Sequence, residues 1–202
     1  MAPARHWLTV VTAALAVVVL TGCAATDAST APVAMSKPSH SHGAMTPAEM
    51  ADMSVKREPS EAARMICSAD IRDQVARVFA LDETVQAKAT WAGDIYTCTY
   101  ALPTGKFVLS VHDATTPATG LRFFQKLQRS LEGAVPIRGV LSFGLPAIQT
   151  SASVAFLKDG KTLTVDATGL PRHAGPDHQS RSDVAYAVAA SVIACWREHP
   201  PA

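Results

Sequence analysis

The chain has 202 residues, of which 48% are apolar and 17% charged, and its formal net charge is +1. These values are typical of a globular protein and exclude a wholly disordered chain, a collagen-like repeat and a small disulfide scaffold. The near-zero charge also argues against nucleic acid as a partner, because binding to phosphates needs a surplus of Lys and Arg. We therefore expect a folded protein that binds no nucleic acid.

The N-terminus has the pattern of an export signal. Arg5 precedes an uncharged apolar run from Trp7 to Leu20, and as a helix this run would rise only about 21 Å, less than the ~30 Å core of a bilayer. The segment Leu20-Thr21-Gly22-Cys23 then resembles the lipobox of bacterial lipoproteins. A short apolar anchor that happens to end near a cysteine is the alternative.

The lipobox resemblance implies a signal peptide over residues 1–22, cleavage directly before Cys23, and a diacylglyceryl group on the sulfur of Cys23. Two acyl chains hold a protein on a membrane far more durably than one. The resemblance therefore predicts a protein anchored by lipid to the extracytoplasmic face of the cell membrane, with the membrane as its first partner.

Residues 23–58 predict a flexible tether, because they contain no aromatic residue and no apolar periodicity and are rich in Ala, Ser, Thr and Pro. This segment also concentrates thioether and imidazole side chains, which are ligands that suit copper. The candidate copper ligands are His40, His42, Met45, Met50 and Met53. A plain spacer or a docking segment is the simpler interpretation, and copper binding is kept as the alternative function.

The folded domain is expected over residues 59–198. The sequence predicts a first helix that begins at Ser68 and ends near Leu81, and then a hairpin with strands over 95–102 and 106–112. Thr116-Pro117 is a cap followed by proline at the first helical position, so a second helix is expected to begin there.

A second hairpin follows around Asp159-Gly160, with alternating apolar residues over 152–156 and 163–167. The last and longest helix is expected from Ser180 to Trp196. The order is therefore α-ββ-α-ββ-α, which predicts an α+β domain: a four-stranded antiparallel sheet from two hairpins, with the helices packed on one face. A few shared residues between the halves suggest a ββα duplication.

Three cysteines remain after Cys23, and in an exported protein they predict one disulfide. The residues themselves leave Cys67–Cys98 and Cys67–Cys195 open. The layout, through Met65–Ser68 and Tyr96–Tyr100, resembles small secreted lipoproteins of actinobacteria whose function is unknown. That resemblance implies the pairing Cys67–Cys98 and an extracytoplasmic location, and it supplies no catalytic residues.

Candidates for chemistry are few, because no serine-hydrolase elbow, zinc-helix motif or phosphate-binding glycine loop occurs in the sequence. His112-Asp113 and Asp166 would share one end of the expected sheet, and a His–carboxylate pair can act as a base. His173 and His178 lie in a loop that could hold a metal. A surface pair and a plain loop are the simpler interpretations, so we expect a non-enzymatic domain that binds a ligand or partner in the cell envelope.

Overall fold

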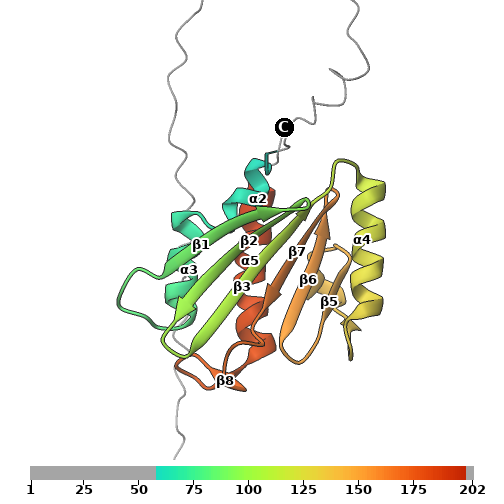
Figure 1. Cartoon of the computed structure of the whole chain (residues 1–202). Helices are drawn as coiled ribbons and strands as arrows, with labels where there is room; N and C mark the ends of the chain where they lie inside the picture. Colours follow the sequence, from blue (N-terminus) through green and yellow to red (C-terminus); the bar gives the residue numbers. More distant parts are fainter. Residues whose placement is uncertain (1–57, 199–202) are drawn as a thin grey trace, which may run out of the picture. The chain divides into compact units, whose positions relative to one another are not determined.

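The computed structural model describes residues 58–198, and its centre is one antiparallel sheet of seven strands in the order β1-β2-β3-β7-β6-β5-β4 (Figure 1). The central pairing joins β3 to β7, so the two predicted hairpins lie side by side in the middle of the sheet. The strands are β1 (Gln86–Ala92), β2 (Ile95–Leu102), β3 (Gly105–Asp113), β4 (Val135–Pro136), β5 (Ala147–Gln149), β6 (Ser153–Lys158) and β7 (Lys161–Asp166).

Helices precede, interrupt and follow the strands. Ser68 and Thr116 cap α3 and α4, each accepting a hydrogen bond from the amide three residues further on, as the sequence predicts. The helices are α2 (Glu61–Met65), α3 (Ala69–Val78), α4 (Pro117–Ser130) and α5 (Arg181–Glu198), with a 3-10 helix η1 (Gly139–Ser142) between β4 and β5; a separate two-stranded ribbon pairs β8 (His173–Ala174) with β9 (Gln179–Ser180).

The core lies on both faces of the sheet. Val154 and Phe156 of β6 belong to a large cluster with α2, α3 and α5, whereas Ala155 and Leu157 pack against Phe124 of α4. Because successive side chains of a strand point to opposite faces, α4 covers the face of the sheet opposite to α5. In Figure 1, α3 and α5 lie behind the sheet, and α4 lies beside β5 and β6.

The α+β class is confirmed, but the prediction of four strands is wrong. The edge strand β1 shows no apolar alternation because most of its residues are exposed. The strands β4 and β5 have only two and three residues, too few to show a period of two. The sheet is therefore wider than the two hairpins that carry a strong sequence pattern.

The prediction that all helices pack on one face is also wrong, because α4 and α5 lie on opposite faces. Each follows a hairpin, as a ββα duplication requires, and the hairpins meet through β3 and β7. Two equivalent units side by side in one antiparallel sheet would put their helices on the same face. The two ββα segments are therefore not equivalent in the structure.

The first and last elements of the described chain are fixed to each other. The indole Nε1 of Trp196, which is 2% exposed, donates a hydrogen bond of 3.0 Å to the carbonyl oxygen of Ala62. The amide of Ser60 donates to Oδ2 of Asp113 at 2.7 Å, and Nζ of Lys161 lies 2.9 Å from Oδ1 of the same carboxylate. The end of β3, the start of α2 and the C-terminal part of α5 thus meet at one end of the domain.

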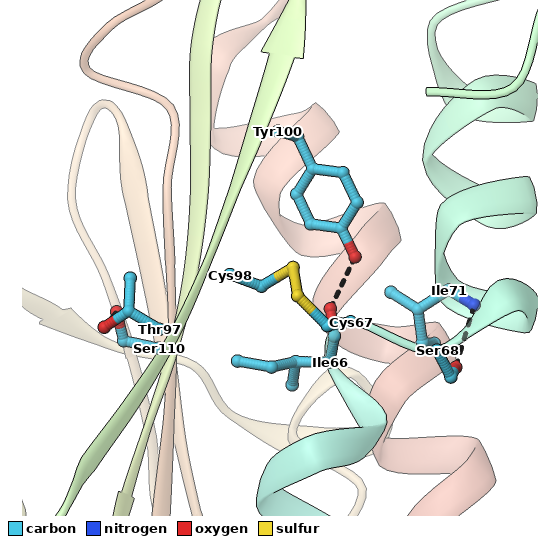
Figure 2. The surroundings of a disulfide bond; sticks show 8 residues. All are labelled: Ile66, Cys67, Ser68, Ile71, Thr97, Cys98, Tyr100 and Ser110. Atoms are coloured by element: carbon cyan, nitrogen blue, oxygen red, sulfur yellow. Dashed lines mark hydrogen bonds between the residues drawn. A yellow bond between two sulfur atoms is a disulfide. The ribbon is translucent and has the colours of Figure 1, made fainter. Parts of the chain in front are cut away.

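A disulfide joins Cys67, which follows α2, to Cys98 in β2, with 5.5 Å between their Cα atoms (Figure 2). The pairing implied by the resemblance is therefore the one the structure contains, and the alternative Cys67–Cys195 is wrong. Beside it the buried Tyr100 hydroxyl donates to the carbonyl oxygen of Ile66. Burial raises the pKa of the Tyr100 phenol. The link between α2 and β2 is thus both covalent and hydrogen-bonded.

Candidate functional site

A surface recess beside the N-terminal end of α5 is the candidate ligand site of the described domain. Its volume is about 360 Å³, and Ser151, Arg172, His173 and Arg181 line it. Ser151 lies in the turn between β5 and β6, Arg172 and His173 follow β7, and Arg181 is the first residue of α5. Two parts of the chain, the β5–β6 turn and the stretch from Arg172 to Arg181, therefore build one cationic hollow.

Local hydrogen bonds fix two of the lining side chains. Nη1 of Arg181 donates to the carbonyl oxygen of Thr168 at 3.3 Å, and Nδ1 of His173 lies 3.1 Å from the carbonyl oxygen of His178 across the β8–β9 ribbon. An imidazole that donates through Nδ1 keeps Nε2 available for another partner. The guanidinium of Arg181 likewise retains four further N–H groups.

The electrostatics of the recess favour an anion. No acidic side chain is among the described residues that line it, and no ion pair of residues 58–198 includes Arg172 or Arg181. The nearest carboxylate in sequence, Asp183, accepts hydrogen bonds from the amide and hydroxyl of Ser180 and so caps α5. Among the described residues, two positive charges therefore face one hollow with no carboxylate paired to them.

The predicted grouping of His112, Asp113 and Asp166 is wrong. In the β3–β7 register Asp166 pairs with Val108, four residues from His112, which corresponds to roughly 13 Å along the strand. The His112 ring instead stacks on Phe123 of α4, with 3.7 Å between ring centroids. Asp166 therefore lies too far from His112 to form a His–carboxylate pair with it.

Asp113 is fully buried, and its carboxylate contacts the Ser60 amide and the Lys161 ammonium group. Burial by itself would raise the pKa of its carboxyl group, but the hydrogen bond from the Ser60 amide and the charge of Lys161 outweigh that effect and hold the pKa below its usual range. The ionised carboxylate is thus part of the contact between β3, β7 and α2.

Metal binding by the loop with His173 and His178 gains no support from the structure. Within residues 58–198 no three His, Cys, Asp or Glu side chains gather into a group that could hold a metal ion. The lipidation site Cys23 and the candidate copper ligands lie outside the described residues, so those predictions stay predictions.

Ser151, Arg172 and Arg181 are site residues that the sequence did not predict. Arg181 nevertheless carries a signal, because a cation in the first turn of a helix opposes the helix dipole, which favours acidic residues there. Ser151 and Arg172 lie in turns that only the fold brings to the same place. A residue that breaks a local rule is a common mark of a binding site.

No known protein family, curated protein or solved structure matches this chain. Between residues 58 and 198, no helix is both long and apolar enough to span a bilayer.

Proposed function

We propose that this protein is a lipid-anchored extracytoplasmic lipoprotein whose domain binds a ligand or partner of the cell envelope. The observation that carries the location is the disulfide between Cys67 and Cys98, because such bonds persist in oxidising compartments and are rare in the cytosol. The lipobox Leu20–Cys23 supports the same location independently, since it would export the chain and acylate Cys23.

The proposed role is binding rather than catalysis. His112 stacks on Phe123, and Asp113 is engaged by Lys161 and the Ser60 amide, so structural contacts already occupy the groups that a sheet-based acid–base site would use. The cationic recess at the start of α5 offers donors for a ligand instead. A hydrolytic turnover that His112→Ala abolishes in a protein of unchanged stability would contradict the binding role.

The anchor is tested by mass spectrometry of the detergent-extracted protein and by incorporation of labelled palmitate. We expect a chain that begins at Cys23 and carries acyl chains, and Cys23→Ser should abolish both the labelling and the cleavage. The matched control is Cys195→Ser, which replaces another cysteine far from the lipobox and should leave the labelling unchanged. Equal labelling of Cys23→Ser and the wild type would refute the anchor.

Copper binding by the segment with Met45, Met50 and Met53 is the second candidate, favoured by the concentration of thioether and imidazole groups there. The test is a Cu(I) titration of the full-length protein against the variant with all three residues changed to Leu. Met65→Leu is the control, since this methionine belongs to α2 and lies outside the tether. Indistinguishable affinities of the triple variant and the wild type would remove the copper proposal.

A further inference from the structure

We propose that the recess lined by Ser151, Arg172, His173 and Arg181 binds the phosphate group of a small ligand. This inference rests on the proposed binding role and names its ligand class, but it does not depend on the anchor. The volume of about 360 Å³ lies at the lower end of the ~300–1,000 Å³ that small-molecule sites occupy.

The lining side chains match an oxyanion with several oxygen atoms. A guanidinium group presents a planar fork of donors that fits phosphate and carboxylate, and two such groups face this recess. The Ser151 hydroxyl adds a donor of a different direction. Together the two guanidinium groups and this hydroxyl offer more donors than the two oxygen atoms of a carboxylate use, so a phosphate is the better match.

The charges of the ligand-free domain give the second argument. Arg172 and Arg181 have no carboxylate within 4.0 Å among residues 58–198, and Arg181 also lies in the first turn of α5. Two like charges at one hollow, one of them opposing the helix dipole, lower the stability of the empty site. A bound anion would relieve both effects.

The site is already arranged before a ligand arrives. The Thr168 carbonyl holds the Arg181 guanidinium, and the His178 carbonyl holds the His173 ring. Side chains that are fixed in advance lose less conformational freedom on binding, which favours affinity.

The test is calorimetric titration of the protein extracted from the membrane in neutral detergent, with inorganic phosphate as the ligand. We expect saturable binding that Arg172→Gln and Arg181→Gln each weaken about tenfold or more, since charge-assisted hydrogen bonds are about twice as strong as neutral ones. The control Arg129→Gln removes an exposed arginine of α4 and should leave the affinity unchanged. In phosphate-free buffer Arg172→Gln should melt no lower than the wild type.

Further titrations identify the source of the phosphate. Glycerol phosphate represents a soluble phosphorylated ligand, and short-chain phosphatidic acid represents a lipid headgroup. Phosphatidylcholine of the same chain length is the control for phosphatidic acid. Tighter binding of either phosphate monoester supports the site and names the source. The proposal is overturned by no saturable binding up to about 10 mM phosphate, by equal binding of acetate, or by full affinity in the Arg172→Gln/Arg181→Gln variant. If the purified chain carries no acyl group but still binds phosphate, the anchor is refuted and the phosphate site is not.

Discussion

Replacing Asp113 by Asn should destabilise the domain by about 3 kcal/mol, because it leaves the ammonium group of Lys161 beside a neutral partner. At 2.9 Å and an effective dielectric constant of about 20, the gross attraction is about 6 kcal/mol, from which the cost of desolvating both charges is subtracted. The amide of Ser60 keeps an acceptor in the variant, so the loss stays at the lower end of the ~3–5 kcal/mol typical of broken buried pairs.

The measurement is urea unfolding of the full-length protein, followed by tryptophan fluorescence, to which the buried Trp196 and Trp91 of β1 both contribute. In a thermal unfolding experiment, the melting temperature should fall by roughly 10 °C. The control Asp159→Asn removes an exposed carboxylate that also pairs with a lysine, and it should change stability by less than about 1 kcal/mol. The double variant Asp113→Asn/Lys161→Met should lose less than the sum of the single variants. Additivity within about 0.5 kcal/mol would refute the reasoning.

The contribution of Asp113 to the free energy of unfolding should fall as the pH falls. The folded-state pKa of Asp113 is lowered, so the stability it contributes is present above its unfolded value of about 3.9 and is lost as the pH falls through the folded value. Wild-type protein should therefore lose stability below about pH 4 more steeply than Asp113→Asn. Parallel acid transitions of the two proteins would contradict this.

Three further outcomes follow from the described contacts. Changing Cys67 and Cys98 together to Ala should cost about 4 kcal/mol in urea unfolding, since the bond closes a 31-residue separation, and a loss below about 1 kcal/mol would contradict this. Tyr100→Phe should cost about 1–2 kcal/mol and should weaken the loss of stability above about pH 10, because the raised pKa keeps the folded-state phenol protonated there. Gly120→Ala should cost at least about 2 kcal/mol in thermal unfolding, since its Cβ would lie 2.0 Å from a carbonyl oxygen of the β6–β7 turn; an unchanged melting temperature would refute that contact.

Elements with a strong local signal could be predicted from the sequence. The Asp159-Gly160 pair forms the β6–β7 turn with positive φ at both residues, and Thr116 caps α4. The alternation of Phe107, Leu109 and Val111 also matches their complete burial in β3. Each of these signals arises within a few neighbouring residues.

The placement of α4 could not be predicted in the same way. An amphipathic pattern shows that one side of a helix is buried, but not which face of a sheet covers it. The run Val154–Leu157 is buried without interruption, and a continuous apolar run is typical of a strand covered on both faces. The run Val154–Leu157 thus indicated that helices cover both faces of the sheet at β6, although an alternating pattern was expected there.

The recess depends on tertiary structure even more strongly. Arg172 and Arg181 are nine positions apart, and Ser151 comes from another part of the sheet, so no spacing in the sequence links them. The disulfide was open between two pairings on the residues alone, because pairing depends on which elements the fold brings together.

The closure of the domain through Trp196 and Ala62 also separates the start of the described chain from the recess. In Figure 1, α2 lies beside one end of α5, where Trp196 contacts Ala62. Arg181 lies fifteen residues before Trp196, about 22 Å away along the helix axis. The two ends of α5 therefore have different roles: its C-terminal end closes the domain against α2, and its N-terminal end supplies Arg181 to the recess. A ligand can thus enter or leave the recess without disturbing the contact that closes the domain.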